Sequence, residues 1–280
     1  MSRDRLRFAG LGACLRFELA KLLPRVLPWL AILVTIFAIV VEGTLSRNSE
    51  TPLEGYRLFA MLLGDGVLLT SFFLLVLGCL SVNEEISSGS LRAVLLRPAP
   101  REVYILAKLI VLIVFAMILG LIAVATAWIW TAWDSHFQAI VLDLGDGLES
   151  PIIFDADTVA GHARRLSWSI LPSILCAPLF GVLISILVES SGFAVVLGLL
   201  GWAAFRVVGE LGGEWATWSF PYWTERPLQL LKEVAEGIKT NERAVLETDF
   251  TSPQVMAPLG MALILASAAL LIFRWKEIRC

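Results

Sequence analysis

Six stretches of this chain are apolar and uncharged over sixteen or more consecutive residues, and this pattern constrains the fold more than any other feature. A helix of about 20 apolar residues crosses the roughly 30 Å hydrocarbon core of a bilayer. Charged residues make up only 17% of the chain, which excludes a water-soluble enzyme and a nucleic-acid-binding protein. We therefore predict an all-α polytopic membrane protein. Its six transmembrane helices are expected at residues 26–44, 65–83, 105–132, 167–188, 192–210 and 257–274.

Lys and Arg residues are distributed unevenly between the two sides that six spans define. Twelve lie before the first span, between the second and third spans, and after the last span, whereas eight lie in the much longer segments on the opposite side. Because cytoplasmic segments are enriched in Lys and Arg, both termini are predicted to be cytoplasmic. The chain would then be a multi-pass protein of the inner (cytoplasmic) membrane, with outer loops at 133–166 and 211–256 and a cytoplasmic tail at 275–280.

The first 25 residues mix basic residues with Leu and Phe. This pattern predicts a cytoplasmic amphipathic helix that lies in the inner interface of the membrane. Leu11–Cys14 has the form of a lipoprotein cleavage box, but the apolar stretch before Cys14 is too short for the core of a signal peptide. Lipidation of Cys14 is therefore the less favoured alternative. No Cys lies in an outer loop, so disulfides are not expected.

The segment between the second and third spans carries the most informative pattern. Asn83 is followed by two carboxylates, a composition that suits the start of a helix. Leu91, Val94 and Leu95 recur at helical spacing, and Pro98 ends the pattern. These features predict a short amphipathic helix within 84–97 on the cytoplasmic face, joined closely to two spans. Such a helix can transmit motion to the spans, or it can be a solvated connector.

This segment resembles the corresponding one in permeases of the type-2 ABC exporter group, and among them it is similar to the permeases of nitrous oxide reductase maturation and gliding-motility systems. The resemblance implies that the short helix is a coupling helix, which docks in a groove of a separate ATP-hydrolysing subunit. Pro100 departs from the small hydroxyl residue often found there. By resemblance, the docking residues are Glu84, Glu85, Gly89, Leu91, Pro98, Arg101 and Lys108, and Arg92 and Leu95 of the same predicted helix complete the candidate set.

The resemblance also implies the partners. The chain contains no Gly-Lys dipeptide and so no P-loop, which places ATP and Mg on the ABC ATPase subunit and leaves this chain with no cofactor or catalytic residue of its own. A second copy of the chain, or a paralogous permease, is expected beside it in the bilayer. An extracytoplasmic accessory protein is a further expected partner.

The outer loop at 133–166 contains both histidines and a run of acidic residues without Lys or Arg up to Asp157. Metal binding through Asp134, His136 and His162 is one interpretation, but this spacing fixes no ligand geometry. We favour a solvated acidic loop without metal, in which Leu144–Leu148 forms the turn of a small hairpin. In the second outer segment, Pro227–Lys239 has the pattern of an amphipathic helix.

Charged residues inside spans are costly and point to function by default. Glu42, Asp65, Arg206 and Glu210 are all expected in the outer third of the membrane. One interpretation is an ion-paired outer gate. The alternative is that Arg206 extends along the helix and reaches the lipid headgroups.

Two other function classes compete with the permease. A membrane-embedded enzyme needs converging His, Asp or Ser side chains inside the spans, but both histidines are expected in one outer loop. A secondary transporter predicts internal repeats and broken helices, and the sequence gives no clear sign of either.

Overall fold

The structure is a computed structural model that describes residues 3–47, 55–87, 101–134, 137, 140–141, 152–211, 216, 219–224 and 253–275. Its long helices are α1 (Arg3–Leu22), α2 (Val26–Arg47), α3 (Gly55–Ser87), α5 (Arg101–Asp134), α6 (Ala156–Leu187), α7 (Ser191–Glu210) and α9 (Pro253–Trp275). All of these except α1 are long and apolar enough to cross a membrane, which gives the six spans that the sequence predicts. The prediction of an all-α polytopic membrane protein is confirmed.

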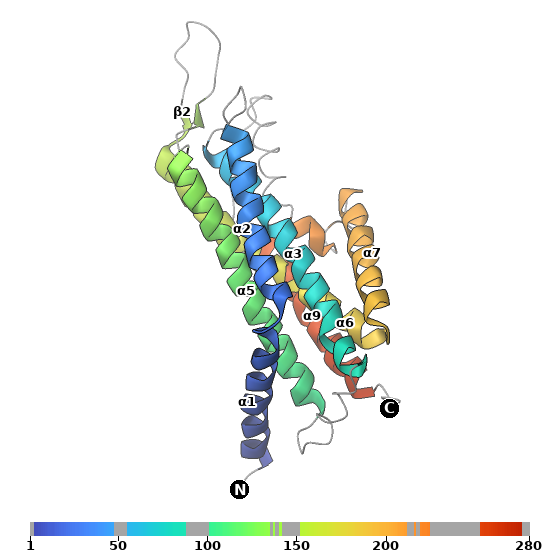
Figure 1. Cartoon of the computed structure of the whole chain (residues 1–280). Coiled ribbons are helices and arrows are strands. Elements are labelled where there is room, and N and C mark those ends of the chain that lie inside the picture. Colours follow the sequence, from blue (N-terminus) through green and yellow to red (C-terminus); the bar gives the residue numbers. More distant parts are fainter. Residues whose placement is uncertain are drawn as a thin grey trace, which may run out of the picture.

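The six spanning helices form an elongated bundle (Figure 1). The start of α1 and the end of α9 lie at the same end of this bundle (Figure 1). We call it the inner end, because the distribution of Lys and Arg predicts that it is cytoplasmic. Here α1 continues past the start of α2 and runs beside the first part of α5 (Figure 1). Phe17 and Leu22 of α1 pack against the hydrophobic core. One face of α1 is therefore fastened to the rest of the protein.

Helices α3 and α6 begin well before the spans that hydropathy marks, at Gly55 and Ala156. Residues 156–166, expected in an outer loop, are thus helical. Hydropathy detects only the part of a helix inside hydrocarbon, whereas backbone hydrogen bonds continue wherever side chains still find packing partners. The Phe59 ring of α3 lies 5.2 Å from that of Trp128 on α5, and His162 of α6 is buried in the same outer region.

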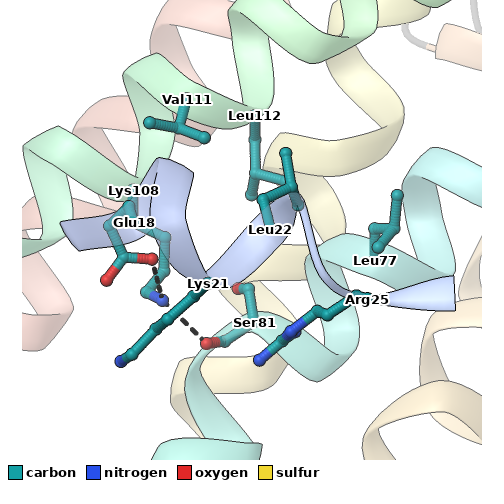
Figure 2. Close-up of a pocket in the computed structure, with 9 residues that line it drawn as sticks. All are labelled: Glu18, Lys21, Leu22, Arg25, Leu77, Ser81, Lys108, Val111 and Leu112. Atoms are coloured by element: carbon teal, nitrogen blue, oxygen red, sulfur yellow. Dashed lines mark hydrogen bonds and ion pairs between the residues drawn. The ribbon is translucent and has the colours of Figure 1, made fainter. Parts of the chain in front are cut away.

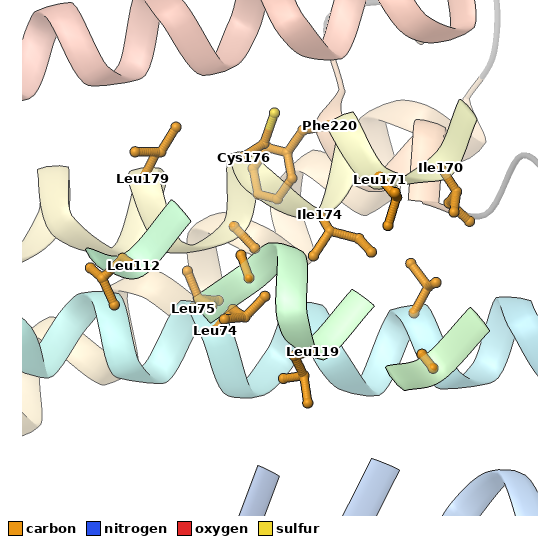
Figure 3. Packing of buried hydrophobic residues seen from close by; sticks show 14 of the residues in the cluster. Leu74, Leu75, Leu112, Leu119, Ile170, Leu171, Ile174, Cys176, Leu179 and Phe220 are labelled. Atoms are coloured by element: carbon orange, nitrogen blue, oxygen red, sulfur yellow. The ribbon is translucent and has the colours of Figure 1, made fainter. Parts of the chain in front are cut away.

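The core is centred on α3 and α6, whose candidate spans are 61% and 72% buried. These two helices approach each other closely at Gly78 and Gly181: a Cβ atom built on Gly78 would lie 3.0 Å from the Gly181 Cα. Small residues permit such an approach between membrane helices. Figure 3 shows part of this core, with Leu74 and Leu75 of α3 directed toward α6, which contributes Ile174.

Two smaller elements complete the described part of the fold. Strands β1 (Ile140–Val141) and β2 (Ile152–Phe154) pair in antiparallel fashion beyond the outer end of α5. Their pairing agrees with a hairpin in this loop, but the predicted turn at Leu144–Leu148 lies outside the described residues. Near the outer end of α7, Ser219 Oγ donates a 2.6 Å hydrogen bond to the Phe205 carbonyl oxygen. The predicted amphipathic helix at Pro227–Lys239 also lies outside the described residues.

Candidate functional site

A buried lysine joins three helices at the inner end of the bundle. Lys108 Nζ of α5 lies 2.8 Å from Glu18 Oε2 of α1 and 2.9 Å from Glu85 Oε1 of α3. It also donates a hydrogen bond of 2.9 Å to the carbonyl oxygen of Ser81. Figure 2 shows how Glu18 and Ser81 converge on the ammonium group from separate helices. Each of the three N–H donors of the lysine thus has an acceptor.

Two further ion pairs extend this arrangement toward the surface. Lys21 Nζ lies 2.8 Å from Glu85 Oε1, and Arg25 Nη2 lies 2.7 Å from Glu84 Oε2. We call the six residues of these neighbouring ion pairs the ion cluster: Glu18, Lys21, Arg25, Glu84, Glu85 and Lys108. It contains three carboxylates and three cations, so its formal charge is zero.

Burial decides how much each ion pair contributes. The side chains of Lys108 and Glu85 are only 4% and 3% exposed, whereas those of Arg25 and Glu84 are 31% and 41% exposed. A buried charge is tolerated when its partners and hydrogen bonds compensate for lost water, and removing one partner leaves an uncompensated charge. The more exposed pair of Arg25 and Glu84 contributes far less to stability, because water screens it. Most of the stabilisation by the cluster therefore comes from Lys108, Glu18 and Glu85.

A small pocket borders the cluster between α1, α3 and α5 (Figure 2). Its polar wall includes Glu18, Lys21 and Lys108. Its apolar wall includes Leu77 of α3 and Leu112 of α5. The cluster thus lies where polar and apolar surroundings meet, as expected for the inner boundary of the membrane.

Side chains also hold the last turns of α3 in place. Ser185 Oγ of α6 accepts hydrogen bonds from the backbone N–H groups of Val82 and Asn83, at 3.2 Å and 3.1 Å. Ser81 Oγ donates to the Gly78 carbonyl oxygen at 2.7 Å. Together with the Lys108 bond to the Ser81 carbonyl, these contacts anchor the inner end of α3 to α5 and α6.

The predicted coupling segment connects α3 and α5, two of the helices that the cluster joins. Glu85 is close to the end of α3, and Lys108 is seven residues after the start of α5. The ion pair between them fixes the two ends of the intervening segment relative to each other. Gly89, Leu91, Arg92, Leu95 and Pro98 lie outside the described residues, and Arg101 is described only as the first residue of α5. Their role in docking stays a prediction.

The sequence predicted a helix start at Asn83, but Asn83, Glu84 and Glu85 lie in the last turns of α3, because the backbone hydrogen bonds of that span continue to Ser87. Glu84, Glu85 and Lys108 were predicted as docking residues, and the structure places Glu85 and Lys108 in buried ion pairs within the chain.

The first 25 residues were assigned only to an interfacial helix. Part of a signal was available: Glu18 and Lys21 follow an i, i+3 spacing, which places a carboxylate and a cation on one face of α1. Arg25 follows α1 and has no such spacing to exploit. For Ser185 no comparable signal exists, because an isolated Ser within an apolar span has no distinguishing spacing.

Two of the four charges of the predicted outer gate form an ion pair in the part of the chain that the structure describes. Arg206 Nε lies 3.4 Å from Glu210 Oε1, one turn along α7, and the guanidinium carbon lies 6.0 Å from the centre of the Trp202 ring. Among the described residues, neither Glu42 nor Asp65 forms an ion pair with Arg206. The gate and the headgroup interpretation of Arg206 both stay open on this geometry.

The metal interpretation of the outer histidines finds no complete ligand set in the described part of the chain. His162 is buried in α6, and His136 lies outside the described residues. No group of three or more His, Cys, Asp or Glu residues that could hold a metal ion occurs among the residues that the structure describes.

Comparison with known proteins bears on the family of this chain. None of the curated proteins compared matches this chain. Residues 14–148, however, match a family described as ABC-2 family transporter protein. The matched range contains every residue of the ion cluster and the whole predicted coupling segment. Together with the six apolar helices, the match supports an ABC-2 type permease, a multi-pass membrane subunit of an ABC transporter.

Proposed function

We propose that this chain is the transmembrane permease subunit of an ABC exporter, which is driven by ATP hydrolysis on a separate ATPase subunit. The observation that carries the proposal is the buried contact of Lys108 with Glu18 and Glu85. This contact ties α1, α3 and α5 together at the point where the predicted coupling segment leaves the bundle.

The mechanism follows from this connection. The ATPase subunit docks on the short helix within 84–97 and moves it during the ATP cycle. Because the flanking ends of α3 and α5 are joined by buried ion pairs, a push on the segment moves both helices and α1 as one body. The close packing of α3 against α6 then passes the motion to the outer half of the bundle.

The remaining components lie outside this chain. ATP and Mg bind to the ATPase subunit, since this sequence has no Gly-Lys dipeptide with which to build a P-loop. A second copy of the chain, or a paralogous permease, completes the membrane part in the inner membrane, with both termini of each copy cytoplasmic. By similarity to the permeases of nitrous oxide reductase maturation and gliding-motility systems, the complex exports a substrate or transmits force to an extracytoplasmic accessory protein.

Purification of the tagged chain from its native membranes tests the proposal. The expected result is co-purification of a P-loop subunit, identified by mass spectrometry as an ABC ATPase, together with vanadate-sensitive ATP hydrolysis by the complex. The chain expressed alone should hydrolyse no ATP. Intact purified chain without any ATPase subunit, obtained under conditions that preserve other membrane complexes, would overturn the proposal.

A further inference from the structure

Two adjacent arginines of α6 lie near its start, at the end of the bundle opposite the inner end (Figure 1). Arg164 and Arg165 are both exposed, and within the described part of the chain neither side chain takes part in an ion pair or hydrogen bond. Asp157, the next carboxylate further out along α6, is seven residues from Arg164, which is about 10 Å along the helix axis. Lys and Arg are disfavoured on the side of a membrane predicted for this end, so two unpaired arginines here call for an anionic partner.

The arginines are part of an open stripe on an otherwise covered helix. The candidate span of α6 is 72% buried, and in its outer half the accessible side chains recur at helical spacing. Trp168 is 53% exposed and follows Arg164 by four residues and Arg165 by three, so the three side chains are neighbours. Pro172 and Leu175 continue the stripe into the apolar part of the span. Cations, an indole and apolar surface thus follow one another in the order of the phosphate, glycerol and acyl parts of a phospholipid.

The depth of the arginines agrees with this order. Ser185 is level with the inner end of α3, because its Oγ accepts hydrogen bonds from the N–H groups of Val82 and Asn83. Arg165 precedes Ser185 by 20 residues, which is about 30 Å along a helix. The hydrocarbon core of a bilayer is also roughly 30 Å thick. With the ion cluster at the inner boundary, the two guanidinium groups therefore lie at the level of the outer phosphates, and Trp168 lies at the outer interface, where indole rings are enriched.

The chemistry of the two side chains favours phosphate. A guanidinium forms two parallel N–H···O bonds with a phosphate group and remains charged at every physiological pH. Adjacent residues point about 100° apart around a helix, so Arg164 and Arg165 flank Trp168 on its two sides and are better placed for two phosphates than for one. A lipid of the cardiolipin type carries two linked phosphates without a balancing amine, whereas phosphatidylcholine carries one phosphate and its own cation.

We propose that the open stripe of α6 binds an anionic phospholipid with two phosphates in the leaflet opposite the ion cluster. Arg164 and Arg165 each bind one phosphate, Trp168 covers the glycerol region, and the acyl chains follow Pro172 and Leu175. The site uses no residue of the ion cluster or of the predicted coupling segment, so it is independent of the proposed function. It fastens the outer half of α6, the most buried of the spans, to the lipid around it.

Quenching of a fluorophore beside the arginines tests the site. A Cβ atom on Gly161 would meet nothing within 4 Å, so Gly161→Cys can carry the fluorophore about one turn beyond the arginines. The other accessible cysteines are replaced by Ser, and the purified chain in micelles of uncharged detergent is titrated with nitroxide-labelled cardiolipin. Quenching should saturate. Unlabelled cardiolipin should reverse it, whereas phosphatidylcholine and inorganic phosphate should not.

Variants assign the binding to the arginines. Arg164→Gln and Arg165→Gln should each raise the half-saturating concentration of cardiolipin about fivefold, the contribution typical of one cation at an anionic lipid surface. Lys at both positions should bind more tightly than Gln at both, because the charges remain although the paired hydrogen bonds are lost. Arg47→Gln is the matched control: Arg47 is 67% exposed but already paired with Asp134, so its loss should leave cardiolipin binding unchanged. Unaltered thermal unfolding of each variant without lipid shows that the fold is intact.

Four results would overturn the proposal. Equal cardiolipin binding by the wild type and the chain with both Gln changes would show that the arginines do not hold the lipid. Equal displacement by phosphatidylcholine would show that the stripe does not select anionic lipid, and equal displacement by inorganic phosphate would identify a free anion as the ligand. Protection of position 161 from a maleimide by a co-purified protein would assign the arginines to an acidic protein surface. None of these results affects capture of the ATPase subunit, which tests the proposed function separately.

Discussion

At the scale of single residues, Lys108 is the common partner of two buried glutamates. It is 90 residues from Glu18 and 23 from Glu85 in sequence, yet all three side chains meet in a nearly water-free site. Replacing Lys108 by Met keeps the volume but leaves two carboxylates buried without their shared cation. We expect the free energy of unfolding to fall by about 3–5 kcal/mol, measured by reversible unfolding in SDS-containing micelles.

An exposed ion pair in the same protein provides the control. Glu102 and Arg274 lie 3.4 Å apart with side chains 56% and 66% exposed, so Glu102→Gln should cost less than about 1 kcal/mol. In the Lys108→Met background, adding Glu18→Gln and Glu85→Gln should recover part of the lost stability, because no buried charge then lacks a partner. Equal losses for Lys108→Met and Glu102→Gln would show that burial does not set the strength of these pairs.

The sequence predicted the individual members of the site better than their connections. Glu84, Glu85 and Lys108 were expected beside the coupling segment because their spacing resembles that of known permeases. Glu18 was not expected, since hydropathy and local spacing evaluate each segment separately, and its partner is determined only when α1 packs against α5. The same limit applies to Arg206. Helical spacing predicts its partner Glu210 on α7, but it cannot predict contacts of Arg206 with other helices.

At the scale of helices, the crossing of α3 and α6 depends on a glycine. A side chain at Gly78 would collide with backbone atoms, among them the Pro178 carbonyl oxygen and the Gly181 Cα, which cannot rotate away. We expect Gly78→Ala to destabilise the fold by about 1–3 kcal/mol, measured as thermal unfolding in detergent.

Gly260 of α9 is the matched control for this crossing. A Cβ atom there would meet nothing within 4 Å, so Gly260→Ala should be neutral or slightly stabilising, as alanine usually is in a helix. If the two variants unfold at the same temperature, α3 and α6 do not approach as closely as described.

The six spanning helices were predictable because a bilayer imposes one requirement, an apolar length, that the sequence displays directly. The outer extensions of α3 and α6 were not predictable in the same way. Charged residues separate these extensions from the apolar runs, Asp65 in α3 and Arg164 and Arg165 in α6. The extensions are helical because Tyr56, Phe59 and Val159 pack against other helices outside the predicted spans. This kind of packing becomes evident only in three dimensions.

At the scale of the whole molecule, orientation in the membrane decides which end meets the ATPase. The distribution of Lys and Arg predicts that residues 84 and 276 are cytoplasmic and residue 146 is outside. Single cysteines at these positions should react with a membrane-impermeant maleimide accordingly: position 146 in intact cells, and positions 84 and 276 only after the membrane is opened. Labelling of position 84 in intact cells would invert the topology and remove the coupling segment from the ATP side.

The central claim is that a separate ATPase docks on the segment between α3 and α5. Replacing Leu91 and Leu95 together by Asp places two carboxylates on the apolar face of the predicted coupling helix, and burying them in a groove costs several kcal/mol. Leu144→Asp with Leu148→Asp repeats the same changes at the same spacing in the outer loop and serves as the control. The measurement is the amount of ATPase subunit that co-purifies with each tagged chain. We predict background capture by the inner variant and wild-type capture by the control, both with six inserted spans; undiminished capture by the inner variant would contradict the account.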